Sequence, residues 1–314
     1  MAPMDRRAIL TSIIAIGTVS ITVSAFRAPQ QALSQAARSA TRIEKVKDSL
    51  YVITGSGIAN RDAFSGGNTA VFLTERGVVL VDTKLPGWGQ AILDQIKTVT
   101  NKPVTTIINT HTHGDHTGSN EFFGSTVEII AHENTKTNMA RMQEFKADKS
   151  KFLPKKTYKD KLSIGTGKDQ VDLYYFGGGH TNGDTFVVFP TVRTIHTGDM
   201  FAWKALPFID ASNGGSVIAH AQTLAKVVTT VQNVDTVITG HTPVLPWGDL
   251  KEYADFNGEF VTWARSQVKA GKTVDQAAAE YRVPEKYKGY TASPGPELTM
   301  AKANLEIIYS ELKK

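Results

Sequence analysis

The chain has 314 residues, a formal net charge of +5 and no cysteine. This length is enough to bury a full hydrophobic core, and 41% hydrophobic with 21% charged residues is the composition of a folded globular protein. The lack of cysteine excludes disulfides, thiolate metal sites and cysteine nucleophiles, so any metal must be held by nitrogen and oxygen ligands.

Residues 1–38 have the pattern of an export signal. Arg6 and Arg7 precede an apolar run over residues 8–26, and small residues follow at 31–37, where cleavage is expected. The arginine pair is also typical of a twin-arginine signal. The alternative is an uncleaved membrane anchor, because the run is just long enough to cross a bilayer. Its six serine and threonine residues favour the cleaved signal, and both interpretations place the rest of the chain outside the cytoplasm, in the periplasm or the medium.

The charge of the remaining chain is small. Residues 1–38 contain four arginines and one aspartate, so residues 39–314 carry a net charge of +2. This is not the basic surface of a nucleic-acid-binding protein, and we expect no nucleic acid partner. A membrane partner is expected only if the N-terminal segment stays uncleaved.

Strands and helices alternate after residue 42. β-Branched residues between turn signals predict strands over 43–46, 51–54, 69–73, 78–81, 104–108, 127–131, 171–176, 185–189, 192–197 and 236–239. Apolar residues at helical spacing predict helices over 88–98, 117–123, 133–144, 216–231, 247–270 and 296–312. The glycine-rich segment 55–67 predicts a mobile loop, and 145–161 has no clear period. Strands and helices in both halves indicate two sheets packed face to face and covered by helices.

The strand at 104–108 runs directly into the most distinctive stretch of the sequence. Within six positions this stretch holds four candidate metal ligands, His111, His113, Asp115 and His116. Extended backbone places His111 and His113 on one side, and Gly114 permits a turn that carries the other two to a neighbouring point. Imidazole and carboxylate groups suit zinc, manganese and iron. The spacing fits two adjacent ions with two ligands each, so further ligands must come from elsewhere in the chain.

Three distant residues share one context, in which a strand is followed by a glycine and then by the ligand. These residues are His180, Asp199 and His241, and we expect all three to bind metal. Three other histidines lack this context. We expect His196, inside a strand, to be packed, and His132 and His220 to be structural.

This set of residues resembles the metallo-β-lactamase superfamily of hydrolases. Asp82, at the end of the strand 78–81, matches the first motif of that family, and the resemblance covers residues 43–245. It implies a four-layer αββα sandwich with a dinuclear metal centre. By this resemblance, the first ion is held by His111, His113 and His180, the second by Asp115, His116 and His241, and Asp199 bridges them. Two zinc ions are expected, with manganese or iron as alternatives.

The expected chemistry follows from the two ions. A hydroxide shared between them has its pKa lowered towards about 7, and the ions also polarise the substrate carbonyl. Asp115 would orient this nucleophile, and Asp82 would hold a ligand imidazole from behind. The expected substrate is a small molecule.

Asp199 bears on the choice of substrate. In zinc β-lactamases the corresponding position is usually cysteine or serine, whereas an aspartate is similar to glyoxalase II-like thioesterases, lactonases, and phosphodiesterase or sulfatase branches. We therefore expect an ester, lactone or amide hydrolase, with β-lactam hydrolysis, as a main or side activity, as the first alternative. A non-hydrolytic metal-binding or redox protein of the same fold is the second. The diiron branch usually has an acidic residue where His113 stands and needs a flavin domain, and neither is present in this sequence.

The substrate cleft and the tail are the last features. Phe64, Phe201 and Trp203 are expected to give the cleft apolar walls, and Lys204 to face an anionic group, although Phe201 and Trp203 fit the core equally well. Within a hydrolase domain of residues 39–314, the segment 247–314 is expected to be a helical extension that packs on the sandwich or forms a homodimer interface.

Overall fold

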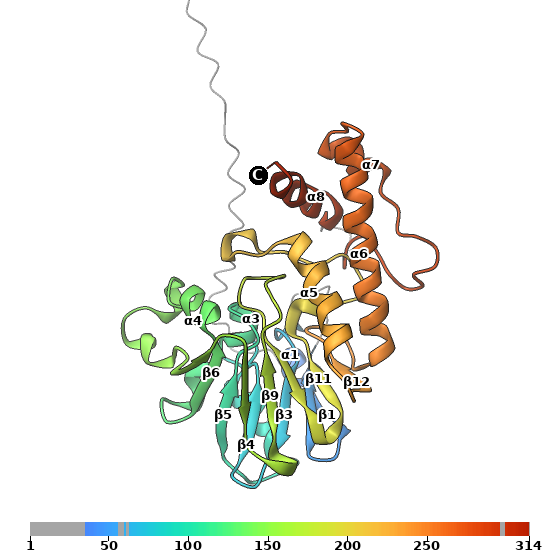
Figure 1. Ribbon diagram of the computed structural model, residues 1–314. Coiled ribbons are helices and arrows are strands. Elements are labelled where there is room, and N and C mark those ends of the chain that lie inside the picture. The colour runs from blue at the N-terminus through green and yellow to red at the C-terminus, as the bar shows by residue number, and fades with distance from the viewer. Residues whose placement is uncertain (1–34, 56–59, 61–62, 296–298, 314) are drawn as a thin grey trace, which may run out of the picture. The chain divides into compact units, whose positions relative to one another are not determined.

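Two mixed β-sheets lie face to face in the computed structural model (Figure 1). The structure describes residues 35–55, 60, 63–295 and 299–313. Residues 32–314 form one compact unit, and the fold described below is that of this unit. The predicted signal or anchor at 1–38 therefore lies almost entirely outside the described residues, as does much of the predicted loop at 55–67. None of the helices in the described part of the chain is long and apolar enough to cross a membrane.

The first sheet is antiparallel on one side and parallel on the other. Its strands follow chain order: β1 (Arg42–Lys47), β2 (Leu50–Thr54), β3 (Thr69–Leu73), β4 (Val78–Val81), β5 (Val104–Ile108), β6 (Glu128–His132) and β7 (Lys156–Tyr158). β1 to β4 pair antiparallel, and β4 to β7 pair parallel. The carboxyl ends of β4, β5 and β6 therefore meet at one edge.

The second sheet supplies the opposite wall of the same edge. Its strands, in spatial order, are β13 (Leu245–Pro246), β12 (Thr236–Ile238), β11 (Thr194–His196), β10 (Phe186–Phe189), β9 (Val171–Tyr174) and β8 (Lys161–Ile164). Only β11 and β12 pair parallel, so their carboxyl ends lie side by side. These two ends precede Asp199 and His241.

Alternating side chains divide the interior into layers. In β4, Val79 and Val81 belong to the core between the sheets, whereas Val78 and Leu80 pack against α2 (Gly89–Lys97). Strand β10 is likewise buried on both faces, and its outer face packs with α5 (Val217–Thr230), α6 (Trp247–Lys269) and α8 (Met300–Glu311). A strand covered on both sides is apolar throughout, which is why these runs lack polar alternation. The predicted αββα sandwich is confirmed.

Helices continue beyond the second sheet. α6 packs along α5, α8 contacts both, and α7 (Val274–Glu280) packs on α8 (Figure 1). Homodimer formation through this part of the chain stays a prediction.

Several predicted elements differ from the structure. The helix predicted over 133–144 is shorter, because α4 (Glu133–Met139) gives way to 3-10 turns at Gln143–Phe145 and Ala147–Phe152. The helix predicted over 117–123 begins earlier, as α3 (Gly114–Thr117), and a 3-10 turn follows at Asn120–Phe123. Strands β7, β8 and β13 and the helices α1 (Gln35–Ala40) and α7 were not predicted. All five are short, and β7 and β8 begin with lysine, which weakens the strand pattern.

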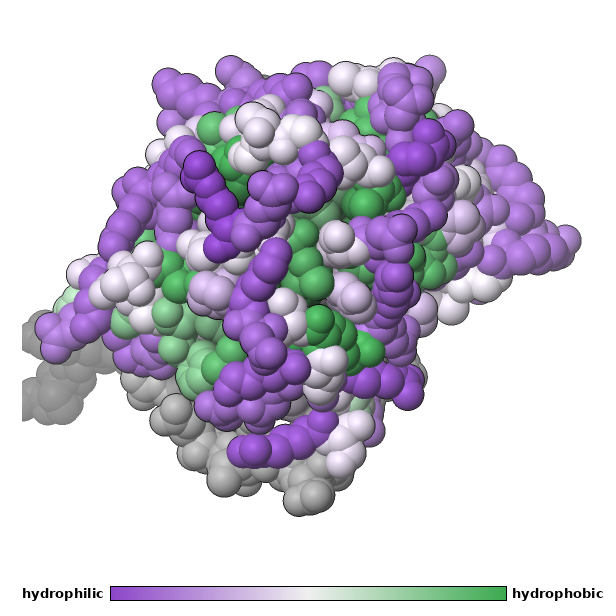
Figure 2. Space-filling model, turned by 90° about the horizontal axis from the view of Figure 1, so that it is seen from below, coloured by the Kyte–Doolittle hydropathy of each residue, from purple (hydrophilic) through white to green (hydrophobic). Residues whose placement is uncertain are grey.

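The end of the unit that carries the hairpin turns faces the viewer in Figure 2, and hydrophilic side chains cover most of it, with apolar groups between them. Ion pairs here join Lys168 to Glu75 and Asp235 to both Lys47 and Arg193. Such exposed pairs contribute little to stability. The buried polar groups instead concentrate at the opposite edge.

Candidate metal centre

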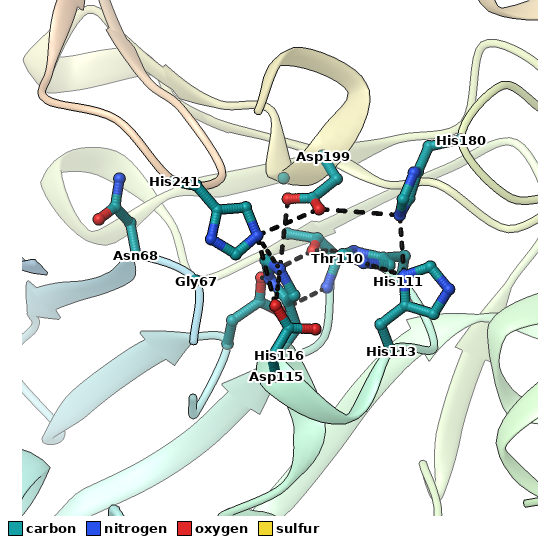
Figure 3. A network of polar contacts seen from close by, with 12 residues as sticks. Gly67, Asn68, Thr110, His111, His113, Asp115, His116, His180, Asp199 and His241 are labelled. Carbon is teal, nitrogen blue, oxygen red and sulfur yellow. Dashed lines mark hydrogen bonds and ion pairs between the residues drawn. The ribbon is translucent and has the colours of Figure 1, made fainter. Parts of the chain in front are cut away.

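Segments from both sheets bring the predicted ligands together at the carboxyl ends of the strands (Figure 3). Asp82 follows β4, His111 and His113 follow β5, and Asp115 and His116 lie on α3. His180 lies on the loop between β9 and β10, and Asp199 and His241 follow β11 and β12. The structure thus gathers all seven predicted ligands, together with Asp82, at one edge.

The first group consists of three imidazoles. His111 Nε2 lies 3.2 Å from His113 Nδ1, and His180 Nε2 lies 2.9 Å from the same atom. All three nitrogens lie within 4.8 Å of one another. The three nitrogens form a compact triad.

The second group combines two imidazoles and a carboxylate. His116 Nε2 and His241 Nε2 are 3.3 Å apart, and Asp115 Oδ2 lies 3.4 Å from the His241 nitrogen and 3.6 Å from the His116 nitrogen. These three atoms again lie within 4.8 Å of one another.

Asp199 lies between the two groups (Figure 3). Its Oδ1 is 3.2 Å from His116 Nε2, and its Oδ2 is 3.2 Å from His241 Nε2 and 3.8 Å from His180 Nε2. Ligands at about 2.0–2.1 Å from a tetrahedral zinc ion are separated by about 3.3 Å. Several donor-atom separations within each group are close to this value, so each group could hold a metal ion.

The imidazoles are also turned so that their lone pairs converge. Four of them donate the N–H on the far side of the ring to a fixed acceptor: His111 Nδ1 to Thr110 Oγ1 at 2.9 Å, His180 Nδ1 to Phe208 O at 2.7 Å, His113 Nε2 to Asp210 Oδ2 at 2.8 Å, and His116 Nδ1 to Asp82 Oδ2 at 2.7 Å. A neutral ring that donates from one nitrogen presents a lone pair at the other. When these rings are neutral, the facing nitrogens could therefore bind a metal ion.

Comparison with known proteins agrees with this geometry. Residues 63–254 match the family model of the metallo-beta-lactamase superfamily. The chain belongs to the metallo-β-lactamase superfamily. This superfamily consists mostly of hydrolases. The prediction that the chain is a member is confirmed.

Individual relatives carry different names. A metallo-beta-lactamase type 2 from Elizabethkingia meningoseptica is 30% identical over 64% of this chain and 78% of its own length. The 2,4-dinitroanisole O-demethylase subunit alpha from Nocardioides sp. is 31% identical over 40% of this chain and 38% of its own length. The solved structure of a metallo-beta-lactamase from Pontibacter korlensis shares the fold, with a TM-score of 0.59 and 20% identity over 69% of this chain and 99% of that one.

Asp82 links three parts of this superfamily site. It is fully buried and accepts hydrogen bonds from Thr110 N at 2.8 Å, Thr110 Oγ1 at 2.7 Å and His116 Nδ1 at 2.7 Å. Its backbone has a φ of 64°, a left-handed conformation that asparagine and aspartate tolerate better than most residues. The carboxylate thus ties β4 to β5 and α3 from behind the donor atoms.

Close backbone approach requires glycine at two positions. A Cβ atom on Gly240 would lie 2.0 Å from Asp199 Oδ1, and one on Gly198 would lie 2.6 Å from Thr110 Oγ1. The glycines that precede Asp199 and His241 therefore pack against neighbouring site residues.

The pKa values of the buried histidines are shifted in two directions, depending on whether imidazoles or carboxylates are the main neighbours. Burial and the neighbouring imidazoles lower the pKa of His111 well below its usual value, and they lower that of His180 to about 4. Both rings are therefore neutral at pH 7, as metal ligation requires.

Neighbouring carboxylates have the opposite effect on the pKa of His116. Burial opposes the charge on His116, but Asp199, Asp115 and Asp82 raise its pKa well above the usual value. Burial likewise opposes ionisation of Asp199, yet His241 and His116 hold its pKa well below the usual range. In the metal-free protein these groups form an ionic network, in which a bound metal ion would take the place of the protons.

Exposure within the site is uneven. The side chains of His113 and Asp115 are 21% and 23% exposed, whereas those of His116 and His180 are at most 2% exposed. Solvent therefore reaches the two groups from the side of His113 and Asp115.

Asp210 contacts the site but was not predicted. Its carboxylate accepts from His113 Nε2, and it also caps the turn at 211–213 by accepting from Ser212 N at 3.0 Å and Asn213 N at 3.1 Å. Although burial acts in the opposite direction, the hydrogen bonds from His113 and from the side chains of Ser212 (Oγ, 2.5 Å) and Asn213 (Nδ2, 2.7 Å) hold the pKa of Asp210 well below its usual value. Asp210 follows no strand and no glycine, so the rule that found Asp199 and His241 could not find it.

Gly67 and Asn68, just before β3, also contact the site and were not predicted. Asn68 Nδ2 donates to Thr239 O at 3.0 Å and to Thr242 O at 2.7 Å, and so holds both sides of His241. Gly67 N donates to Asp115 O at 3.0 Å. Together these contacts join both strand-end loops of the second group.

A buried lysine supports the same segment. Lys84 is fully buried, and its Nζ donates to Gly67 O at 2.8 Å. Burial lowers the pKa of Lys84 to about 7, an effect that Asp115 and Asp82 partly offset. Lys84 lies two residues after Asp82 at the end of β4, so the strand-end rule, applied beyond glycine-preceded residues, would have found it.

The three remaining histidines of the described residues have protein partners. His196 Nε2 lies 3.3 Å from Asn68 O, and its Nδ1 accepts from Gly198 N at 3.0 Å. His132 contacts Lys159 O and caps α4, and His220 Nε2 contacts Met200 O. These positions agree with packed, structural roles.

The predicted cleft residues lie in different environments. The rings of Phe64 and Trp203 are each 5.7 Å from that of His241, and the 39%-exposed Phe208, which was not predicted, is 5.8 Å from that of His180. Phe201 is fully buried and stacks on Tyr253, so it belongs to the core rather than to a cleft wall. Lys204 Nζ lies 3.3 Å from Asp249 Oδ2, and its contact with an anionic substrate stays a prediction.

The buried carboxylate of Asp184 makes the stability of the metal-free protein depend on pH. It accepts from Thr181 N at 2.9 Å and from Thr181 Oγ1 at 2.7 Å, but burial raises its pKa to about 7. An unfolded aspartate has a pKa of about 3.9. Between these values the folded protein holds a proton that the unfolded chain has released, so this group lowers the free energy of unfolding as pH rises.

We expect Asp184→Asn to remove this dependence. Between about pH 4 and about pH 8, the free energy of unfolding of the variant should rise by on the order of 1–4 kcal/mol relative to that of the unmodified protein. Urea unfolding of chelator-treated protein at several pH values measures the difference, with the exposed Asp94→Asn as the control. Parallel stability curves for Asp184→Asn and the unmodified protein would show that another group is responsible.

Proposed function

We propose that this protein is a dizinc hydrolase that cleaves a carboxylic ester, a lactone or an amide. The observation that carries the proposal is the set of six donor atoms in two groups, separated as zinc ligands are and joined by the two carboxylate oxygens of Asp199. When bound, the two ions would supply an activated hydroxide and polarise the substrate carbonyl.

The side chains have distinct roles in this proposal. The first ion would be held by His111, His113 and His180, the second by Asp115, His116 and His241, and Asp199 would contact both. Asp115 is the partly exposed carboxylate of the set, so it can accept a proton from the nucleophile or orient it.

A layer of hydrogen-bond acceptors would keep these ligands in place. Asp82 orients His116, Asp210 orients His113, and Thr110 orients His111. Such partners fix the tautomer and the direction of each ring, so that little reorganisation accompanies binding. The rings of Phe64, Trp203 and Phe208 would give the approaching substrate apolar surroundings.

β-Lactam cleavage is the second candidate. It is favoured by the 30% identical relative named a metallo-beta-lactamase type 2. Against it stands Asp199, where zinc β-lactamases usually have cysteine or serine. The 31% identical relative named an O-demethylase subunit shows that similarity at this level accompanies more than one substrate class.

One panel of substrates tests the proposal. Zinc-loaded, full-chain protein is assayed against chromogenic esters, lactones, amides, thioesters, β-lactams, phosphodiesters and sulfate esters, with chelated protein and Asp199→Ala as controls. We expect turnover of a carboxylic ester, lactone or amide that both controls lose. Fast β-lactam turnover would select the second candidate, and bound iron with a visible absorption band would favour redox chemistry. Zinc binding without turnover of any class would contradict the hydrolase assignment.

Export completes the proposal. We infer a location outside the cytoplasm from Arg6, Arg7 and the apolar run over 8–26. Fractionation of cells that express the full chain, followed by N-terminal sequencing, distinguishes a cleaved signal from a retained anchor.

A further inference from the structure

One short segment orients two of the three imidazoles in the first group. Phe208 O accepts from His180 Nδ1 at 2.7 Å, and Asp210 Oδ2 accepts from His113 Nε2 at 2.8 Å. Asp210 N also donates to His180 O at 2.8 Å. A displacement of residues 207–210 would therefore turn both rings at once.

The C-terminal part of the chain holds this segment. On α8, the side chain of Asn304 is 1% exposed, and its Nδ2 donates to Pro207 O at 3.0 Å. Leu206 N donates to Thr291 O at 3.3 Å, and Thr291 N donates to Lys204 O at 3.1 Å. Backbone and side-chain hydrogen bonds thus fasten 204–207 to residues far beyond it in sequence.

Apolar packing supports the same contact. Leu206 and Ile209 belong to one buried cluster with Met300, Leu305 and Ile308 of α8. A buried amide in such surroundings costs free energy unless it is hydrogen-bonded. Pro207 has no N–H, so its carbonyl is its one polar backbone group, and Asn304 supplies the donor for it.

We propose that Asn304 is a positioning residue for the first metal ion. It acts through the carbonyl of Pro207, which fixes residues 208–210 and thereby the rings of His180 and His113. The inference rests on the proposed metal centre. It goes beyond the family because the matched region ends at residue 254, whereas α8 begins at Met300. The second group, on α3 and the loop after β12, contacts other supports.

Metal binding measures this role directly. Full-chain, metal-free protein is titrated with Co²⁺, whose visible spectrum reports each site, and with Zn²⁺ against a chromogenic chelator. We expect Asn304→Leu and Asn304→Ala to lower the affinity for one ion by about 10–100-fold and to leave the affinity for the other within about threefold. Leucine removes the donor at similar volume, and alanine removes the whole amide.

Two comparisons separate positioning from general damage. Leu305→Ala destabilises the packing of the same helix but leaves the hydrogen bond to Pro207 O in place. Even if it lowers Tm as much as the Asn304 variants do, it should leave the affinities for both metal ions within about threefold of the unmodified protein. In a His113→Ala background, which lacks the first site, Asn304→Leu should leave the remaining ion unaffected. If Asn304→Leu does not fold, Asn304→Ala decides by the same criteria.

The outcomes distinguish this inference from the proposed function. Two ions bound with unchanged affinity in both Asn304 variants would overturn the positioning role and leave the metal centre standing. The positioning role is also overturned if Leu305→Ala causes the same loss of affinity for one ion. Failure of the unmodified protein to bind two ions would overturn the proposed function itself.

Discussion

Replacing Asp199 by alanine is expected to lower kcat/KM by about 10³-fold or more and to leave about one tightly bound zinc ion per chain. Among the seven predicted ligands, Asp199 has oxygen atoms beside both groups, within 3.2 Å of His116 Nε2 and 3.8 Å of His180 Nε2. Its pKa is held well below the usual range by His241 and His116, although burial opposes this, so it contributes a full negative charge at pH 7. Without that charge, two cations would repel one another across the site.

Zinc content after gel filtration and turnover of the substrate identified in the panel check this result. The matched control is Asp235→Ala, just before β12, because the side-chain partners of Asp235, which are Lys47, Arg193 and Thr236, are exposed. The control should retain about two zinc ions and its activity. Two ions and near-normal turnover in Asp199→Ala would show that the bridging role is wrong.

Asp82→Ala is expected to cause the largest loss of stability, about 3–5 kcal/mol in the free energy of unfolding of the metal-free protein. The change leaves three donors, Thr110 N–H, Thr110 Oγ–H and His116 Nδ1–H, without their acceptor in a fully buried place. It also puts alanine at a φ of 64°, which alanine adopts less readily than aspartate. Zinc affinity should fall by about 10–100-fold as well, because His116 loses its orienting partner.

Urea unfolding, read by circular dichroism, measures the loss. Asp172→Ala is the control, since Asp172 is also buried but accepts from the part-buried donors Ser163 Oγ and Gln170 Nε2, which water can reach. We expect a cost of about 1–2 kcal/mol there. An equal or smaller loss in Asp82→Ala would contradict the view that this carboxylate anchors three segments.

Strand ends made much of the site predictable. Runs such as Val78–Val81 are apolar throughout because each face meets a buried layer, so they stand out from the surrounding sequence. Once the strands are placed, the residues that follow them converge, since parallel strands end at one edge of a sheet. This reasoning, with the cluster at 111–116, located the residues that the structure brings together. Their role as metal ligands stays a prediction.

The unpredicted parts depend on contacts that are distant in sequence. Asp210 meets His113 across 97 positions, and its place is set by a loop that α8 supports rather than by any local pattern. Asn68 is similarly separated from Thr239 and Thr242. Hydrogen bonds of this kind follow from the tertiary fold, and a periodicity analysis contains no information on them.

The uneven exposure of the centre has a consequence for metal exchange. His113 and Asp115 are the more exposed residues of the centre, while the side chains of His116 and His180 are at most 2% exposed. We therefore expect a chelator that removes the ions and a substrate that approaches the nucleophile to compete for access on the side of His113 and Asp115. A slowly released product or inhibitor would block this access, and the protein would keep its metal content for as long as that molecule stayed bound.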